Sequence, residues 1–276
     1  MSTVVTRTLA DELDWATASL ADVGVDSPRL DAELLLAHEL RLDRAQLLIR
    51  AGEPIGSDAR TRYLAQVSRR ARREPIAYIL GRKGFRRLDL AVDARVLIPR
   101  PETEHLVEAV VEMAPRSARV ADVGTGSGAV ALALADERSD LHVTGIDLSP
   151  GALAVARLNA SRLRLGVRWA QADLIDDGPY DVVAANLPYI AVGTSLPPDV
   201  ELFEPAGALF AGPDGLAEIR RLLRLLVARG EVSLVALEIG ADQGAAVAAL
   251  VGEAGFDQVE VRQDLAGHDR VVVGAR

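Results

Sequence analysis

Four consecutive residues, Asn186-Leu187-Pro188-Tyr189, have the chemistry needed to hold a planar NH₂ group. The Asn side-chain oxygen and the carbonyl of the residue before the proline can each accept one N–H bond. Pro188 biases Leu187 toward an extended backbone, and the Tyr ring can pack against the plane of the group. Such a site leaves the nitrogen lone pair free to attack an electrophile. Other residues of the chain must supply that electrophile.

A second candidate site, Asp122-Val123-Gly124-Thr125-Gly126-Ser127-Gly128, lies where a predicted strand turns into a helix. Glycines at alternate positions let the backbone approach a ligand closely and present its N–H groups. The spacing G-x-G-x-G differs from the dinucleotide fingerprint, and no Lys-Ser/Thr pair follows as it would in a P-loop. The carboxylate of Asp122 disfavours a pyrophosphate and suits a cationic ligand. A glycine loop alone does not identify a cofactor.

Two further acids extend this site. Asp147 follows Gly124 by 23 residues at the end of the second predicted strand, where a carboxylate can accept both hydroxyls of a ribose. Asp173, followed by Leu174, ends the third strand, and its carboxylate could take an adenine amino group. Either aspartate alone is equally compatible with a helix cap. Together with the glycine loop they predict a pocket for a ribose, an adenine and a cationic tail, which is S-adenosylmethionine.

This combination resembles the class I methyltransferases, and more specifically the bacterial protein-(glutamine) N5-methyltransferases that modify peptide chain release factors. The run Ile98-Pro99-Arg100-Pro101-Glu102-Thr103-Glu104 is the most specific part of the resemblance. The family tetrapeptide is Asn-Pro-Pro-Tyr, and Leu187 replaces its first proline. Leucine keeps the carbonyl acceptor and loses one fixed φ angle. The other matching stretches cover residues 28–36, 74–81, 124–128, 204–205, 212–216 and 264–267.

The resemblance implies methyl transfer to the side-chain amide of the Gln in the Gly-Gly-Gln motif of class 1 release factors. It places Asn186, Leu187, Pro188 and Tyr189 at the reacting amide, with Asn186 also against the cofactor. Arg100 and Glu102 are further candidate substrate contacts. An in-line transfer between positioned groups needs no general base. The histidines are scattered and show no metal-ligand spacing, so no metal is expected: His38, His105, His142 and His268.

Two alternatives stay open. Asn-Leu-Pro-Tyr also resembles the motif of rRNA adenine dimethyltransferases, so an adenine amino-group methyltransferase acting on RNA or DNA is possible chemistry. A non-catalytic S-adenosylmethionine-binding scaffold is the other. The net charge of −9 argues against stable nucleic-acid binding. However, ten basic residues between Arg60 and Arg87 face only Glu74, a local charge of +9. This basic belt predicts contact with an acidic partner or RNA, or else a solvated helix face.

The elements that must position these residues form an α/β protein. We expect a small all-α substrate-recognition domain over residues 1–80, a β-hairpin linker over 81–98 and a Rossmann-like class I methyltransferase domain over 99–276. The hairpin strands are predicted at 85–92 and 96–98, and the irregular segment 190–212 is predicted to be a lid or binding loop. Seven strands of a mostly parallel sheet are predicted at 119–123, 142–146, 168–172, 181–185, 233–238, 258–262 and 270–273. Helices are predicted between most of these strands, at 130–136, 152–162, 216–228 and 245–254.

Composition sets the remaining expectations. The 276 residues are 49% hydrophobic and only 4% aromatic, so the core must be built mainly from Ala, Val and Leu. Cysteine is absent, which excludes disulfides and thiolate chemistry and fits a reducing cytoplasm. No apolar run approaches the roughly 18 residues of a membrane helix, and no secretory signal is evident. We therefore expect a soluble cytoplasmic protein that does not bind membranes.

Overall fold

A computed structural model describes residues 7–276, which form two compact units. Of the described residues, 7–81 and Pro197–Phe203 form the helical unit, and Arg82–Leu196 and Glu204–Arg276 form the α/β unit. Residues 1–6 of the expected helical domain lie outside the described residues. The predicted hairpin therefore belongs to the α/β unit, and a short piece of the irregular segment 190–212 belongs to the helical unit.

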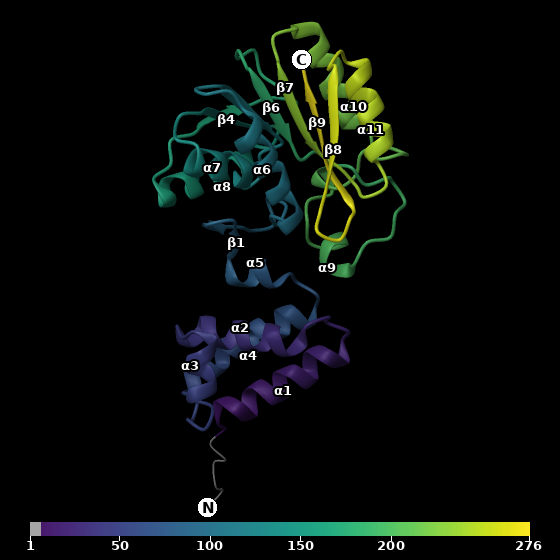
Figure 1. The fold of residues 1–276 in the computed structure, drawn as a ribbon. Coiled ribbons are helices and arrows are strands. Elements are labelled where there is room, and N and C mark those ends of the chain that lie inside the picture. Colours follow the sequence, from purple (N-terminus) through teal and green to yellow (C-terminus); the bar gives the residue numbers. More distant parts are fainter. Residues whose placement is uncertain (1–6) are drawn as a thin grey trace, which may run out of the picture. The chain divides into compact units, whose positions relative to one another are not determined.

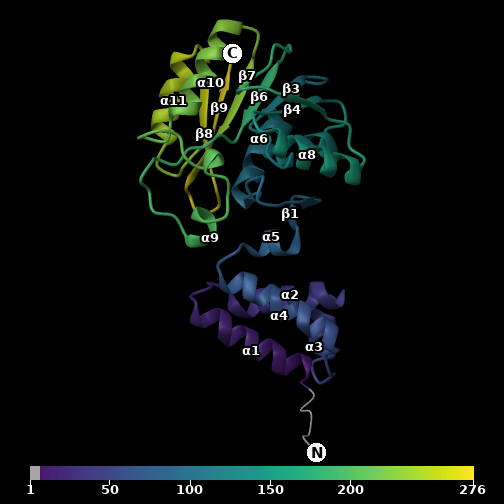
Figure 2. The ribbon, with the colours of Figure 1, turned by 180° about the vertical axis from the view of Figure 1, so that it is seen from behind.

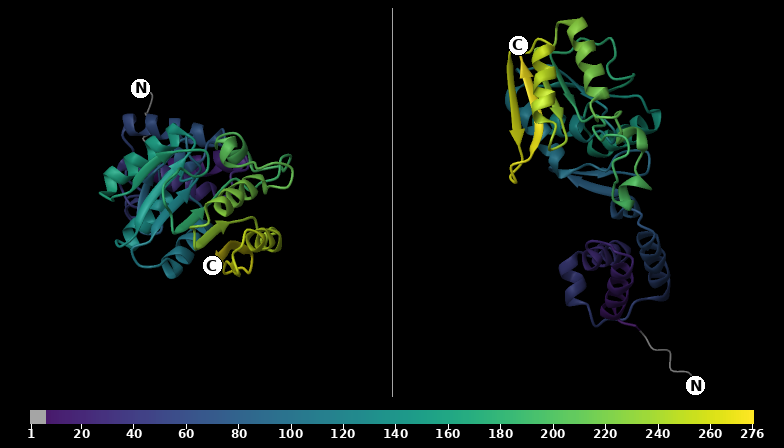
Figure 3. Two further views of the ribbon diagram at one scale, coloured as in Figure 1. Left: turned by 90° about the horizontal axis from the view of Figure 1, so that it is seen from above. Right: turned by 90° about the vertical axis from the view of Figure 1, so that its right-hand side faces the viewer.

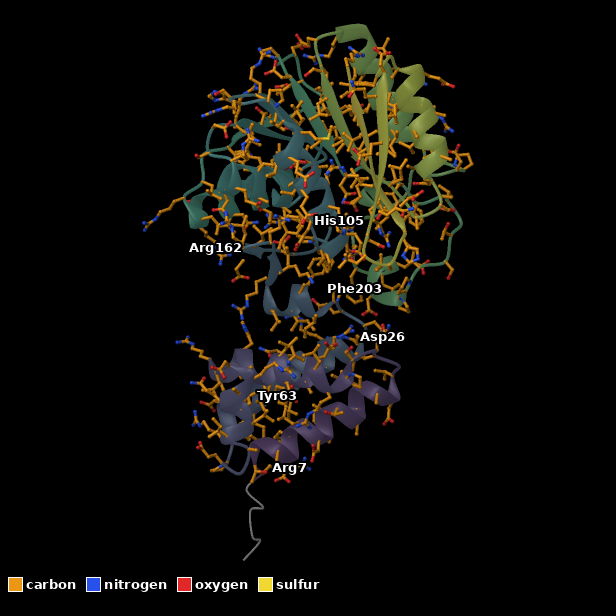
Figure 4. All side chains as sticks on the ribbon, in the orientation of Figure 1. Arg7, Asp26, Tyr63, His105, Arg162 and Phe203 are labelled. Atoms are coloured by element: carbon orange, nitrogen blue, oxygen red, sulfur yellow. The ribbon has the colours of Figure 1, made fainter. Side chains whose placement is uncertain are left out.

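The helical unit begins with a capping box, in which Thr8 accepts from Asp11 N and the Asp11 carboxylate accepts from Thr8 N. Its interior is apolar, and the fully buried Tyr63 (labelled in Figure 4) donates to the carbonyl of Ala32 at 3.3 Å. Asp31 and Arg70 form a buried ion pair at 2.7 Å, and Arg70 also contacts Asp199 at 2.7 Å. The helices are α1 Leu9–Asp22, α2 Pro28–Leu40, α3 Arg44–Ile49, α4 Ser57–Ala71, α5 Ile76–Leu80 and α9 Pro198–Glu201.

The basic belt is largely neutralised by carboxylates. Among the described residues, only Arg72 and Lys83 of its ten members form no ion pair. Arg86, for example, binds both Glu137 and Glu108, and these hydrogen bonds raise its pKa. Such pairing leaves little free positive charge on these residues.

The hairpin of the α/β unit differs from the predicted one. Its strands are β1 Arg82–Phe85 and β2 Leu88–Ala91, joined by a two-residue turn in which Arg86 has φ 49°. The prediction of a strand at Val96–Ile98 is wrong. Ile98 N donates to the Glu204 carboxylate at 3.2 Å, so a side chain satisfies the backbone group that a strand partner would otherwise take.

The sheet of the α/β unit has seven strands in the order β5-β4-β3-β6-β7-β9-β8, with β9 antiparallel to both β7 and β8 (Figure 1). This confirms the predicted mostly parallel seven-stranded sheet. The right-hand view of Figure 3 shows β8 and β9 as a long antiparallel pair. The strands are β3 Arg119–Val123, β4 His142–Asp147, β5 Arg168–Gln171, β6 Val182–Ala185, β7 Leu234–Glu238, β8 Gln258–Gln263 and β9 Asp269–Ala275.

Helices cover both faces of the sheet, α6, α7 and α8 on one face and α10 and α11 on the other (Figure 2). Alternation along β6 explains this layering: Val182 and Ala184 enter one core, while Val183 and Ala185 enter the other. The parallel strands β3, β4, β5, β6 and β7 all end at the same edge, where the loops that follow them can carry polar groups. The helices are α6 Glu104–Met113, α7 Ala129–Glu137, α8 Pro150–Leu163, α10 Ala217–Arg229 and α11 Gly244–Glu253, with 3₁₀ turns η1 Pro101–Thr103 and η2 Ala206–Ala208.

No helix within residues 7–276 combines the length and the apolar character needed to cross a membrane.

Candidate active site

A cavity of about 440 Å³ opens at the carboxyl ends of β3, β4 and β6. The glycine loop, the acid at the end of β4, the acid after β5 and the tetrapeptide after β6 all contribute to its wall. Of the predicted site residues, Gly128, Tyr189 and Glu102 do not line the cavity. Those that line it are Arg100, Gly124, Thr125, Gly126, Ser127, Asp147, Asp173, Leu174, Asn186, Leu187 and Pro188.

The glycine loop is tightly positioned. Gly124 has φ 74°, which favours glycine, and a Cβ there would lie 3.2 Å from Leu187 Cδ2. The two predicted motifs are therefore in contact. Gly128 serves packing, because a Cβ there would lie 2.9 Å from the Trp169 ring. Its position at the start of α7, away from the cavity wall, sets it apart from the expected cofactor contacts.

Two acids hold this loop through hydrogen bonds. The Asp122 carboxyl is buried and accepts from the Thr125 hydroxyl at 2.5 Å and from Ala131 N at 3.0 Å; burial raises its pKa to about 6. Asp122 thus holds the loop. Asp147 accepts from Gly126 N at 2.9 Å and from Ser149 N at 2.8 Å, and burial raises its pKa as well.

The donor set fits S-adenosylmethionine. Each Asp147 oxygen accepts one backbone N–H and keeps a second lone pair, so the carboxylate can still receive ribose hydroxyls. Asp173 is half-exposed at the cavity wall, where its carboxylate pairs with Arg221 at 2.7 Å. An adenine amino group would share that carboxylate with Arg221. Leu174, with φ 70°, is buried beside it and offers an apolar surface to a base.

Asn186 lies at the end of β6 with its side chain at the cavity wall. Its Nδ2 donates to Thr103 Oγ1 at 3.0 Å, and within residues 7–276 no donor reaches Oδ1. The Leu187 carbonyl likewise accepts no hydrogen bond from the described part of the chain. Two acceptors at neighbouring positions are thus available, as a planar NH₂ group requires.

Tyr189 is held rather than exposed. It lies away from the cavity wall, and burial raises the pKa of its hydroxyl to about 12. Gln243 Nε2 donates to the Tyr189 carbonyl at 3.0 Å and to the Asp214 carbonyl at 3.4 Å, while its Oε1 accepts from Gly240 N at 2.9 Å. The site prediction missed Gln243, although it lies five residues after the buried strand β7, at the ligand-binding edge.

Arg100 and Glu102 differ in their placement. Arg100 lines the cavity and donates to the buried Glu204 carboxylate at 2.5 Å, which fixes the segment before η1 against the end of the irregular segment. Glu102 does not reach the cavity wall. The next residue, Thr103, does line it and binds Asn186, so the predicted run contains a site residue one position further on.

Comparison with known proteins agrees with this geometry. Residues 11–81 match the PrmC N-terminal domain model and residues 120–195 match a methyltransferase domain model. Among solved structures, a methyltransferase from Pyrococcus furiosus matches 80% of this chain and 98% of its own with a TM-score of 0.53 at 16% identity. The catalytic domain of hMettl16, in complex with MAT2A 3′UTR hairpin 6, matches 76% of this chain and 81% of its own with a TM-score of 0.57, also at 16% identity.

The fold and the cavity define a class I S-adenosylmethionine-dependent methyltransferase. Release factor glutamine methyltransferases from Neisseria gonorrhoeae and Deinococcus radiodurans are 43% and 41% identical to the chain. The alignments cover 90% and 97% of this chain and 93% and 98% of those proteins. The chain belongs to the release factor glutamine methyltransferase family. This confirms the predicted family, fold class and methyl donor.

Proposed function

We propose that the chain methylates the side-chain amide nitrogen of the Gln in the Gly-Gly-Gln motif of class 1 peptide chain release factors. The observation that carries the proposal is a pair of acceptors at the wall of the cofactor cavity, Asn186 Oδ1 and the Leu187 carbonyl, which receive no hydrogen bond from residues 7–276. A primary carboxamide has two N–H donors in one plane, which matches this pair. The nearly full-length family relationship supports the release factor as substrate.

The residues act by positioning. Asn186 Oδ1 and the Leu187 carbonyl accept the two N–H bonds and aim the amide nitrogen into the cavity. Because positive charge grows on that nitrogen during transfer, the same two acceptors stabilise the transition state more than the ground state. S-adenosylmethionine supplies a methyl group already activated by the sulfonium. The new N–C bond takes the place of the S–C bond, and one amide proton leaves to water afterwards.

The cofactor contacts we propose are Gly124–Ser127, Asp147, Asp173, Leu174 and Asn186. Gly128 supports them through packing. Pro188 and Tyr189 hold the tetrapeptide, and Arg100 holds the cavity wall through Glu204. Glu102 is the least supported of the substrate contacts, because it does not line the cavity.

We further propose that residues 1–80 form a release-factor recognition domain, residues 81–98 a linker and residues 99–276 the catalytic domain. The match of residues 11–81 to the PrmC N-terminal domain supports the first of these. A cytoplasmic location follows from a substrate that acts in translation termination.

The test is mass spectrometry of a class 1 release factor incubated with the enzyme and S-adenosylmethionine. One added methyl group on the Gly-Gly-Gln glutamine is the expected result. The rival function is adenine methylation of RNA or DNA, since an adenine amino group presents the same two N–H donors. An unmodified release factor together with methylated nucleic acid would overturn the proposal. Salt-dependent nucleic-acid binding would point the same way.

A further inference from the structure

The carboxyl group of Glu238 is buried at the end of β7, one strand away from the strand that carries Asn186. The side chain is 1% exposed, and neither carboxyl oxygen has a hydrogen-bond partner within the described residues. Burying an unpaired carboxyl group costs stability, so its presence beside a site calls for a physical reason.

Charged and titratable groups approach Glu238 from each neighbouring segment. Glu102 and Thr103 come from η1, Arg100 from the residue before it, Arg270 from β9 and Tyr189 from the end of the tetrapeptide. The two arginines are already bound, Arg100 to Glu204 and Arg270 to Asp264. The hydroxyls of Thr103 and Tyr189 remain as neighbours that can donate a proton. Neither forms a hydrogen bond to the Glu238 carboxyl within the described residues, but the nearby Thr103 hydroxyl lowers the pKa of Glu238 against the larger effect of burial.

Thr103 connects Glu238 to Asn186. Its Oγ1 accepts from Asn186 Nδ2 at 3.0 Å, and Thr103 is 4% exposed, so water does not compete for its hydroxyl. A hydroxyl has one proton to donate and can accept in two directions. If the proton goes to Glu238, Thr103 can only accept from Asn186. The Asn186 amide is then held with Nδ2 toward Thr103 and Oδ1 toward the cavity.

We propose that Glu238 is a positioning residue that fixes, through the Thr103 hydroxyl, which end of the Asn186 amide faces the substrate. The inference rests on the proposed function, because it concerns how Asn186 accepts an amide N–H. An ionised Glu238 only accepts hydrogen bonds and keeps Asn186 Oδ1 facing the cavity. A protonated Glu238 can instead donate to Thr103, and the freed hydroxyl proton can then bind Asn186 Oδ1. The Asn186 amide then rotates by half a turn. Its Nδ2, a hydrogen-bond donor, now faces the NH₂ group of the substrate, which is also a donor, so no hydrogen bond can form between them.

This two-state arrangement has a pH dependence. Burial raises the pKa of Glu238 to about 7. The productive amide orientation is therefore populated above that pH and lost as the pH falls below it. Single-turnover rates of amide methylation should rise with pH across this range and then level off.

The experiment compares single-turnover methylation of a release factor between pH 6 and pH 8.5 for four proteins. The rate of the parent enzyme should fall toward the acid end of this range, which gives the pH profile an acid limb. Glu238→Gln should lose the limb, since glutamine cannot ionise, and should be slower than the parent at pH 8.5. Thr103→Val should also lose it and react about tenfold more slowly, the effect of one hydrogen bond. Thr103→Ser keeps the hydroxyl and should restore the limb.

Binding of S-adenosylhomocysteine, measured by calorimetry, reports whether each variant is folded, and it should change little. Glu253→Gln is the matched control, because Glu253 is exposed on α11 and its side chain forms no hydrogen bond or ion pair within residues 7–276. An acid limb that persists in Glu238→Gln would overturn the inference while leaving the proposed function intact. A parent enzyme inactive at every pH would instead remove the proposed function, and this inference with it.

Discussion

The side-chain amide of Gln243 donates a 3.0 Å hydrogen bond to the carbonyl oxygen of Tyr189. The same amide bridges to the Asp214 carbonyl and to Gly240 N, so one side chain joins three loops at the edge of the sheet. The contact at Tyr189 is close packed: a Cβ on Gly215 would lie 2.1 Å from the Tyr189 oxygen. The conformation of the proposed catalytic tetrapeptide thus depends on a residue more than fifty positions away in the sequence.

Replacing Gln243 should therefore impair catalysis, although Gln243 itself is not among the proposed substrate contacts. We expect Gln243→Ala to lose roughly 1–3 kcal/mol of stability and to lower kcat about tenfold. Gln243→Glu should be worse, because a carboxylate cannot donate to two carbonyls. The measurements are chemical denaturation and methylation kinetics, with the exposed neighbour variant Asp242→Asn as control. Equal behaviour of the two Gln243 variants would contradict the donor role.

Asn186→Ala tests the proposed acceptor directly. Loss of one preorganised group that stabilises transition-state charge typically costs 10²–10³ in rate, and we expect kcat to fall by about that factor. Affinity for S-adenosylhomocysteine should change by only a few fold. A variant that retained the parent kcat would exclude Asn186 from the reaction, whereas complete loss of cofactor binding would show that its cofactor contact outweighs its role as acceptor for the substrate amide.

Leu187→Pro introduces the residue that the resemblance to Asn-Pro-Pro-Tyr leads us to expect at this position. The carbonyl acceptor is kept, so we expect kcat within about threefold of the parent, with φ fixed by the proline ring. The lost packing against Gly124 works in the opposite direction, since Leu187 is buried there. Leu187→Gly, which loses both packing and rigidity, should be clearly slower. Methylation rates that rank glycine above proline would contradict this account of the turn.

Asp147→Ala probes the cofactor site. The carboxylate accepts Gly126 N and Ser149 N and is proposed to accept the ribose hydroxyls. Its removal should weaken S-adenosylhomocysteine binding by tenfold or more, because hydrogen bonds to a charged group are worth about 1.5–3 kcal/mol each. Calorimetry measures this effect, and Asp140→Ala, on the loop before β4, is a carboxylate control. Unchanged affinity would place the ribose elsewhere.

Glu238→Gln should raise stability at high pH while it lowers activity. Burial raises the pKa of Glu238 from 4.5 to about 7, so the folded state disfavours the ionised form. Below pH 4.5 both states are protonated and the substitution has little effect through ionisation. Above pH 7 ionisation costs the parent about 3 kcal/mol, which the variant avoids. Denaturant unfolding at pH 4.5 and pH 8 measures the difference, and an equal effect at both pH values would contradict the buried charge.

Much of the architecture was predictable from the sequence. Near-continuous apolar strands alternate with amphipathic helices, and this pattern alone indicates a parallel sheet covered on both faces. The prediction failed at Val96–Ile98, where three consecutive apolar residues, two of them β-branched, are typical of a strand. The buried carboxylate of Glu204, more than a hundred residues later, takes the backbone donor of Ile98 instead. No local pattern contains that information.

The sequence by itself determined which groups gather at the proposed site, because Asn186, the glycine loop and Asp147 each lie at or just after the end of an apolar strand, and parallel strands bring their ends to one edge. Only the tertiary structure decided how those groups are held. Thr103, Glu238 and Gln243 are isolated polar residues in the chain, and their roles arise from hydrogen bonds and burial between distant segments. Periodicity reports which face of an element is buried, but not which distant polar group it meets there.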